Sequence, residues 1–258
     1  MKRALTAVVL APFIVYVVLW APHLVFLAVL AAVALLCFHE YSGIVSGYGI
    51  DRPGPVGYAA GLVLLLVPQD GSLALALALI TLAALALSLA RNDLPKGLPR
   101  AAALLLGVLY TFGLWRWAIP LRALNPHWLL FALALNWIGD VAALYAGKAF
   151  GRHKLAPRIS PAKTWEGAIA SFAASLVFGF FYLTRLIPSV SPIQSIALAA
   201  AGNLAGQIGD LAESAMKRGA GVKDSGAMLP GHGGWLDRVD SSLFTLPVIY
   251  WLVSLIRA

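Results

Sequence analysis

Charged residues and cysteine are both scarce in this 258-residue chain. Only 12% of its residues are charged and 60% are hydrophobic, whereas a soluble domain carries roughly a quarter charged residues. This composition excludes an ordinary soluble domain and indicates an integral membrane protein. The single cysteine, Cys37, excludes an intrachain disulfide. Its place inside an apolar run favours a small buried side chain over a reactive thiol.

Several nucleotide-binding and hydrolase motifs are also missing. The chain contains no Walker A sequence, no Rossmann fingerprint preceded by a strand and no nucleophile elbow. The net charge of +8 could indicate nucleic-acid binding, but the sequence has no basic stripe with interleaved aromatic residues. Because cytoplasmic loops of membrane proteins are ordinarily basic, we attribute the excess to topology and expect no nucleic-acid partner.

Apolar segments long enough to cross a bilayer, at about 20 residues each, recur along the chain. We predict an all-α, polytopic membrane protein with about nine transmembrane helices. The first is expected to be a retained span, because no cleavage site follows it. The predicted spans are 4–20, 24–44, 55–68, 72–90, 101–119, 128–150, 165–187, 193–216 and 236–256.

Lysine and arginine are distributed unevenly between alternate loops, which predicts the orientation. With a cytoplasmic N-terminus, the inside loops hold most of these residues, and the opposite side holds only Arg116, Arg122, Arg185 and Arg257. The odd number of spans then places the C-terminus outside. The polar loops 151–164 and 217–235 both face the cytoplasm in this arrangement.

Ionisable residues divide the chain into two parts. Residues 1–120 hold few within their spans, the exceptions being Glu40 and Arg116, so we interpret this part as packing and lipid-facing helices. Glu40 lies near the cytoplasmic end of its helix, close enough to reach a site there. Residues 121–258 form the predicted catalytic region. Within it, residues 210–240 hold five of the chain's eleven acidic residues and six glycines.

Polar residues in the later spans follow helical spacings of three and four, so each set lines one face. A charged side chain at mid-bilayer costs about 2.5–3.5 kcal/mol of insertion free energy. The carboxylates on these faces must therefore be paired, hydrated or bound to a cation. Hydrogen bonding between helices is the simpler interpretation for Asn136, Asp140 and Gln207. The eighth span contributes Asn203, Gly206, Gln207, Asp210, Glu213, Ser214 and Lys217, the sixth Asn136, Asp140 and Gly147, and the ninth Asp237, Asp240 and Ser241.

Carboxylates without a His or Cys cluster suit a hard cation such as Mg²⁺. The basic residues beside Asp210 and Asp237 would repel a metal unless an anion also bound. Glycines allow backbone N–H groups to approach phosphate. The carboxylates, basic residues and glycines of residues 210–240 are therefore together best suited to binding a metal–polyphosphate complex. In loop 151–164, Thr164 is a natural N-cap with Glu166 in the first turn; the alternative is that Ser160, Lys163 and the helix start hold phosphate.

Two motifs resemble those of the CDP-diacylglycerol synthases. One runs Ser214-x-x-Lys217-Arg218, then Lys223-Asp224, then His232-Gly233-Gly234-x-x-Asp237-Arg238-x-Asp240; the other is Ser160-Pro161-x-Lys163-Thr164-x-Glu166-Gly167. Asp140 with Gly147-Lys148 resembles a further family motif. The resemblance implies transfer of CMP from CTP to phosphatidate, giving CDP-diacylglycerol and pyrophosphate. It also implies Mg²⁺, possibly with a second, monovalent cation such as K⁺, and a homodimer in the inner (cytoplasmic) membrane.

The resemblance also implies roles for individual residues. Asp210 and Asp237 would be the metal carboxylates. The substrate-binding group would comprise Asp140, Ser160, Lys163, Thr164, Glu166, Asn203, Ser214, Gly233 and Gly234. The remaining catalytic residues would be Lys217, Arg218, Lys223, Asp224, His232, Arg238 and Asp240.

Two other functions remain open from the residues alone. A cytidylyltransferase acting on an isoprenoid phosphate would need the same chemistry, because acyl chains are recognised by apolar surfaces that carry little specific code. An ion-coupled transporter would also use intramembrane carboxylates and broken helices, and it predicts polar sites in both halves. The crowding of charge into one half argues against the transporter.

Overall fold

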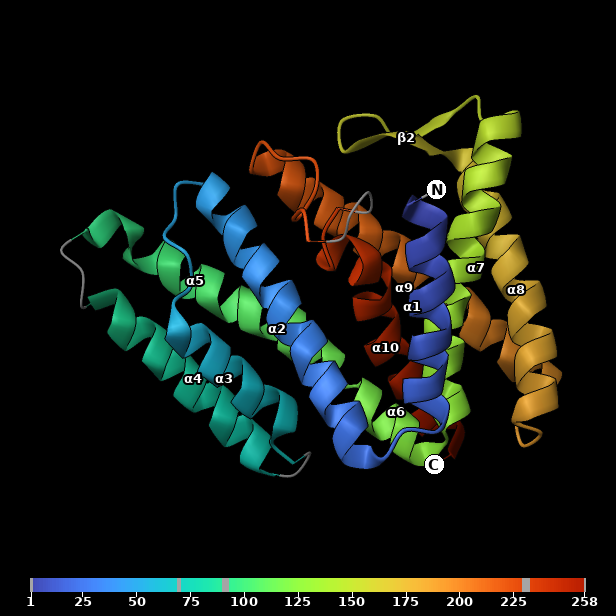
Figure 1. Cartoon of the computed structure of the whole chain (residues 1–258), viewed down its shortest axis with the longest axis horizontal. Coiled ribbons are helices and arrows are strands. Elements are labelled where there is room, and N and C mark those ends of the chain that lie inside the picture. Colours follow the sequence, from blue (N-terminus) through green and yellow to red (C-terminus); the bar gives the residue numbers. More distant parts are fainter. Residues whose placement is uncertain (1, 69–70, 90–92, 229–232, 258) are drawn as a thin grey trace. The chain divides into compact units, whose positions relative to one another are not determined.

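The computed structural model describes residues 2–68, 71–89, 93–228 and 233–257, which are mostly helical (Figure 1). The chain forms two compact units, and each is described by itself. Unit 1 contains Met1–Thr6, Pro22–Arg116 and Met216–Arg238. Unit 2 contains Ala7–Ala21, Trp117–Ala215 and Val239–Ala258. The units interleave along the sequence, and the functional division predicted at residue 120 stays a prediction.

Unit 1 is built from apolar helices that pack around aromatic rings. Its core includes Phe38 and Phe112, whose ring centroids lie 5.5 Å apart. A side chain at Gly61 would collide with the Phe112 ring, and one at Gly107 with Tyr41, so these glycines let the rings reach neighbouring helices. The elements are α2 (His23–Gly47), α3 (Pro55–Leu66), α4 (Gly71–Leu89), the 3₁₀ turn η1 (Leu94–Lys96), α5 (Gly97–Gly107) and the π-helical segment η2 (Val108–Gly113).

The predicted span 101–119 is not one regular helix. It comprises α5, then the π-helical η2, and it ends shortly after α6 (Ala118–Leu124) begins. Arg116 follows η2, is buried, and donates from Nη2 to the carbonyl oxygen of Val67 at 2.8 Å. The wider π turn is a local feature that an apolar run of this length does not reveal.

Unit 2 holds most of α1 (Lys2–Leu19) and the helices that carry most of the predicted catalytic region. They are α6, α7 (Pro126–Phe150), α8 (Trp165–Leu186), most of α9 (Pro192–Gly219) and most of α10 (Leu236–Arg257). Helices α7 and α8 lie side by side (Figure 1), with Phe131, Phe178 and Tyr182 stacked between them. Gly179 of α8 faces Ala199 of α9 so closely that a side chain there would collide.

Loop 151–164 is more ordered than an all-α prediction allows. It folds into an antiparallel hairpin of β1 (Lys154–Ala156) and β2 (Ser160–Thr164), which joins α7 to α8. Thr164 ends β2 and caps α8, its Oγ1 accepting a hydrogen bond from the Gly167 amide at 3.2 Å. The predicted N-cap is therefore confirmed. The pairing itself was missed, because no repeated apolar–polar alternation marks these two short strands.

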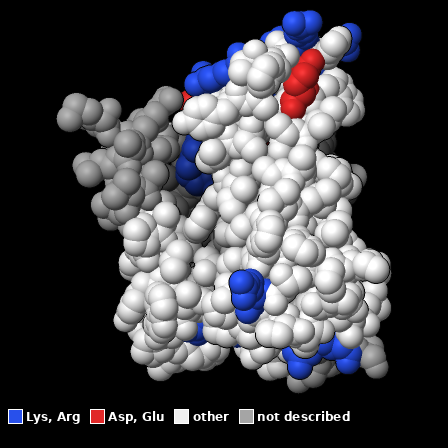
Figure 2. Space-filling view, turned by 90° about the vertical axis from the view of Figure 1, so that its right-hand side faces the viewer, with Lys and Arg blue, Asp and Glu red and all other residues white. Residues whose placement is uncertain are grey.

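Six helices among the described residues are long and apolar enough to cross a membrane, and two further apolar helices are shorter. The described residues of the nine predicted segments are largely helical, but nine crossings are not confirmed, because α1, α3 and the polar α9 are not among those six helices. On the face drawn in Figure 2, a broad uncharged surface separates the Lys and Arg side chains that gather toward its upper and lower ends. The structure is that of a multi-pass helical membrane protein.

Candidate active site

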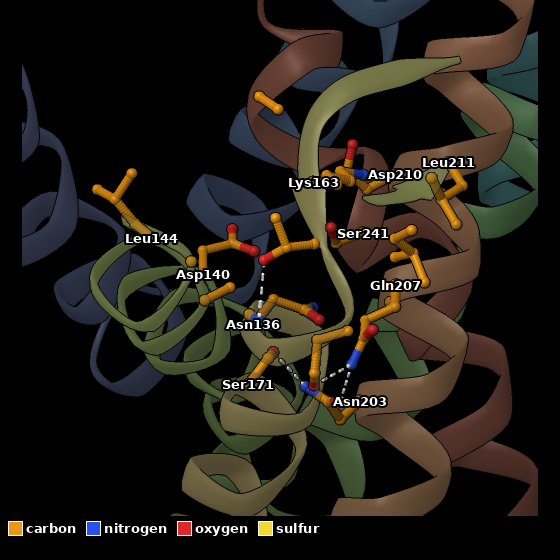
Figure 3. A pocket seen from close by; sticks show the side chains of 18 of the residues that line it. Asn136, Asp140, Leu144, Lys163, Ser171, Asn203, Gln207, Asp210, Leu211 and Ser241 are labelled. Atoms are coloured by element: carbon orange, nitrogen blue, oxygen red, sulfur yellow. Dashed lines mark hydrogen bonds and ion pairs between the residues drawn. The ribbon is translucent and has the colours of Figure 1, made fainter. Parts of the chain in front are cut away.

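A cavity of about 350 Å³ lies in unit 2 between α7, α8, α9 and the hairpin, with Ser241 of α10 also at its wall (Figure 3). The polar faces predicted for the sixth and eighth spans both line it. Its polar or charged lining residues are Asn136, Asp140, Lys148, Lys163, Thr164, Ser171, Asn203, Gln207, Asp210 and Ser241. Its apolar lining includes Ala143, Leu144, Leu155, Ala168 and Leu211.

One end of the cavity is charged. Lys163 Nζ, from β2, lies 2.5 Å from Asp210 Oδ2, from α9 (Figure 3). Ser214, one turn further along α9, donates from Oγ to Asp210 Oδ1 at 3.4 Å. The two paired side chains are 26% and 30% exposed, so water and a ligand can reach the pair. The hairpin therefore has a clear structural role in this site, since it brings the lysine to the helix.

A group of carboxylates includes Asp210 of this charged end. Asp240 of α10 is buried, and Asp210, Glu213 and Asp140 lie close enough to interact with it electrostatically. The Asp240 Oδ1 atom accepts a hydrogen bond from the Ser241 amide at 2.7 Å. Within the described part of the chain, no three His, Cys, Asp or Glu side chains are arranged as a preformed metal cage. The cluster thus concentrates negative charge and oxygen donors on the side of the cavity where Lys163 lies.

The opposite end of the cavity is a network of amides and hydroxyls. Asn203 Nδ2 donates to Ser171 Oγ at 3.0 Å (Figure 3). It also donates to Ser175 Oγ at 2.9 Å. Gln207 Nε2 donates to Asn203 Oδ1 at 2.6 Å and to the Ala168 carbonyl at 3.2 Å. Hydrogen bonding between helices, the simpler interpretation, is confirmed for Gln207. Sequence reasoning missed Ser171 and Ser175, although their spacing of four places them on one face of α8.

A second charged cluster lies in unit 1, around Asp237 at the start of α10. Its Oδ1 atom is ion-paired with Lys217 of α9, and both side chains are almost completely buried. Its Oδ2 atom accepts from the amides of Ser225 at 3.0 Å and Gly234 at 2.8 Å. Gly233 has a positive φ of 76°, which favours glycine, and its missing side chain leaves room for this carboxylate.

Other predicted site residues lie on the hairpin, at the start of α8, and in the segment that runs from the end of α9 into α10. Glu166, in the first turn of α8, accepts a hydrogen bond from His153 Nδ1 at 2.7 Å. Arg218 donates to the Val222 carbonyl at 3.1 Å. Lys223, Asp224 and Arg238 are exposed, Ser160 begins β2, and His232 lies outside the described residues. Asp210 and Asp237 belong to different units, so their sharing of one ion stays a prediction.

The apolar helices, and the charged cavity that three of them enclose, define the class: a multi-pass membrane protein with an internal polar site. Residues 1–256 match the cytidylyltransferase family. The chain belongs to this family, which confirms the resemblance, and the match also covers the first half of the chain, which holds none of the motifs quoted above.

The similar curated proteins include three bacterial enzymes named phosphatidate cytidylyltransferase. The one from Staphylococcus aureus (strain COL) is 33% identical over 258 residues, covering 96% of each chain. The one from Staphylococcus saprophyticus is 35% identical over 205 residues, covering 78% of each. The one from Bacillus subtilis (strain 168) is 39% identical over 154 residues, covering 58% of this chain and 57% of the relative.

Proposed function

We propose that this enzyme transfers CMP from CTP to phosphatidate, producing CDP-diacylglycerol and pyrophosphate. The observation that carries the proposal is the cavity in a chain of this family: Lys163 and Asp210 lie at one end, and Leu144, Leu155 and Leu211 contribute apolar walls. A substrate with a phosphate head and acyl chains matches both kinds of surface. The lipid would enter sideways between helices, keeping its chains in the bilayer, and CTP would arrive from the cytoplasm.

The chemical difficulty in this reaction is electrostatic. The attacking group is a phosphate monoester whose second pKa of about 6 leaves it largely ionised at neutral pH, so no strong general base is required. Two anions must instead be brought together and held in line. Lys163 and Lys217 each contact an aspartate in the structure. In the proposed mechanism these lysines contact phosphate oxygens and stabilise the charge of the departing pyrophosphate.

The chemistry of the side chains supports a hard divalent cation. Asp210, Glu213 and Asp140 lie close to the buried carboxylate of Asp240, and carboxylate oxygens are the donors that Mg²⁺ prefers. Mg²⁺ commonly uses one or two carboxylates plus substrate phosphates, so a preformed protein cage is not required. We propose that Asp210 and Asp237 hold the ion. When bound, it would neutralise phosphate charge and help to orient the nucleotide. A monovalent cation would suit the remaining carboxylates.

The same proposal includes the cellular setting. Loops 151–164 and 217–235 are proposed to face the cytoplasm, where CTP is available, and the enzyme is proposed to work as a homodimer in the inner (cytoplasmic) membrane. The uneven distribution of Lys and Arg between loops supports the orientation, and the resemblance to the family supports the dimer.

The test is incubation of the purified protein with phosphatidate, Mg²⁺ and CTP labelled at the α phosphate. Label is expected in the organic phase with the wild type and is expected to be lost with Asp237→Asn or Asp210→Asn, each still folded. Label that appears only with an isoprenoid phosphate in place of phosphatidate would reassign the lipid substrate. Wild-type activity in purified Asp237→Asn would refute the assignment of that carboxylate.

A further inference from the structure

Glu40 is a buried carboxylate of α2 that the proposed reaction does not use. It is only 3% exposed, and such a group is costly in an apolar helix bundle unless its charge is satisfied. It lies within unit 1, near the end of a helix whose other buried residues are mostly apolar. The hydrogen bonds that satisfy the Glu40 carboxylate therefore indicate its structural role.

Among the described residues, three donors in the segment that leads into α10 hydrogen-bond to the Glu40 carboxylate. The Trp235 amide donates to Oε1 at 3.0 Å, and the Leu236 amide donates to Oε2 at 2.8 Å. The Ser225 hydroxyl donates to Oε2 at 2.9 Å. The first amides of a helix have no partner within that helix and favour negative charge. Glu40 thus caps α10 from a position 195 residues earlier in the chain.

Ser225 connects this cap to Asp237. The Ser225 hydroxyl group donates its hydrogen to Glu40, and its oxygen accepts a hydrogen bond from the Asp237 amide at 3.3 Å. The Ser225 amide in turn donates to Asp237 Oδ2 at 3.0 Å. Two hydrogen bonds therefore tie both the backbone and the carboxylate of Asp237 to a serine that Glu40 holds.

Two glycines leave the space that this arrangement needs. A Cβ atom at Gly226 would lie 2.6 Å from Glu40 Oε1, and one at Gly234 would collide with both Glu40 and Ser225. Part of the glycine content of this segment therefore serves close approach to a protein carboxylate. The close approach of Gly226 and Gly234 to Glu40 is an observation independent of the hydrogen bonds. It also indicates that the segment leading into α10 packs around this carboxylate.

We propose that Glu40 is a positioning residue, which fixes the Asp237 carboxylate for reaction through Ser225 and the capped start of α10. This proposal rests on the proposed function for the role of Asp237. The hydrogen-bonding pattern sets the requirement: both Glu40 oxygens must accept. A glutamine has the same length but would turn an N–H₂ group toward a donor, whereas an aspartate keeps two acceptors and loses one methylene.

The test compares purified full-length Glu40→Gln, Glu40→Asp and Ser225→Ala with the wild type in the labelled-CTP assay. Glu40→Gln is expected to lower kcat about 100-fold, the size of effect that a displacement near 1 Å can produce. Glu40→Asp is expected to retain more activity than Glu40→Gln, and Ser225→Ala to show a loss as well. The matched control is Asp51→Asn, the same acid-to-amide change at an exposed residue of unit 1 that pairs with Arg100; it is expected to match the wild type.

Hydrogen exchange provides a readout that does not depend on the substrate. In Glu40→Gln, the amides of Ser225 and 234–237 are expected to exchange faster, with α3 and α5 unchanged. Faster exchange throughout unit 1 would show a general folding role and overturn the proposal. Wild-type kcat in Glu40→Gln, or less activity in Glu40→Asp than in Glu40→Gln, would also overturn it. Activity in Asp237→Asn would instead refute the proposed site, while the exchange data would still decide whether Glu40 orders this segment.

Discussion

Lys163 and Lys217 each pair with an aspartate, but water reaches the two pairs differently. The Lys163–Asp210 side chains are 26% and 30% exposed, whereas those of Lys217 and Asp237 are 10% and 5% exposed. A partly exposed ion pair contributes little to stability, while breaking a buried pair leaves an uncompensated charge. Substitution of the two lysines should therefore separate effects on catalysis from effects on folding.

Replacement of Lys163 should affect activity far more than stability. Lys163→Ala is expected to lower kcat/KM for CTP about 100-fold, as expected for loss of one group that stabilises phosphate charge. Its free energy of unfolding should fall by no more than about 1 kcal/mol. Steady-state kinetics and thermal unfolding in detergent measure the two quantities. Lys154→Ala, an exposed change on the same hairpin, is the control, and unchanged kinetics in Lys163→Ala would exclude a catalytic role.

Replacement of Lys217 should affect both activity and stability. Lys217→Met leaves Asp237 buried without its lysine and is expected to cost about 3–5 kcal/mol of folding free energy in addition to the loss of activity. The double variant Lys217→Met/Asp237→Asn removes the buried charge and keeps an oxygen that can accept from the Ser225 and Gly234 amides. It is therefore expected to regain most of that stability and to remain inactive. Thermal unfolding of the single and double variants measures the difference. A double variant as unstable as the single one would contradict this account.

At the scale of the element, the hairpin and the start of α8 position the lysine that reaches Asp210. Thr164 closes β2, lines the cavity and caps α8 with its hydroxyl group. Thr164→Val keeps the shape and removes the cap, so the free energy of unfolding is expected to fall by about 1 kcal/mol. The Lys163 side chain should also be placed less well, which lowers kcat. Thr164→Ser is the control, since it keeps the hydroxyl; equal behaviour of the two variants would show that the cap is unimportant.

Periodicity predicted the helices and their polar faces because both depend on local spacing. Asn136, Asp140, Asn203 and Asp210 were assigned to faces from positions three and four apart, and all four line one cavity. Spacing identifies a face but not its partner. The contact of Glu40 with Ser225 joins residues 185 positions apart, so no local pattern reveals it.

The hairpin and the π turn escaped prediction for a related reason. Each β strand is held by its partner rather than by an internal pattern, and β1 has only three residues. In the fifth predicted span, the π turn leaves the apolar composition of the sequence unchanged. The hydropathy of a segment reflects its length and its apolar character. Neither property distinguishes a π turn from an α-helix.

At the scale of the whole molecule, the uneven loop charges predict which segments face the cytoplasm. Arg158→Cys in the hairpin and Ser189→Cys between α8 and α9 place single thiols at exposed positions. Both are made in a Cys37→Ala background, because Cys37 is the chain's only cysteine. A membrane-impermeant maleimide is expected to label Arg158→Cys only in inverted vesicles and Ser189→Cys only in right-side-out vesicles. The reverse pattern would invert the topology and move the proposed site away from CTP.

The amide end of the cavity has a consequence for the bilayer as a whole. One helical turn beyond Asn203 and Asn136, Ala199 and Ala132 are fully buried, so apolar packing continues where the polar lining stops. Under the proposed function, a headgroup would enter and leave through the same leaflet. The enzyme would thus enrich one monolayer in its product, and supply of the opposite monolayer would require a separate lipid-translocating protein.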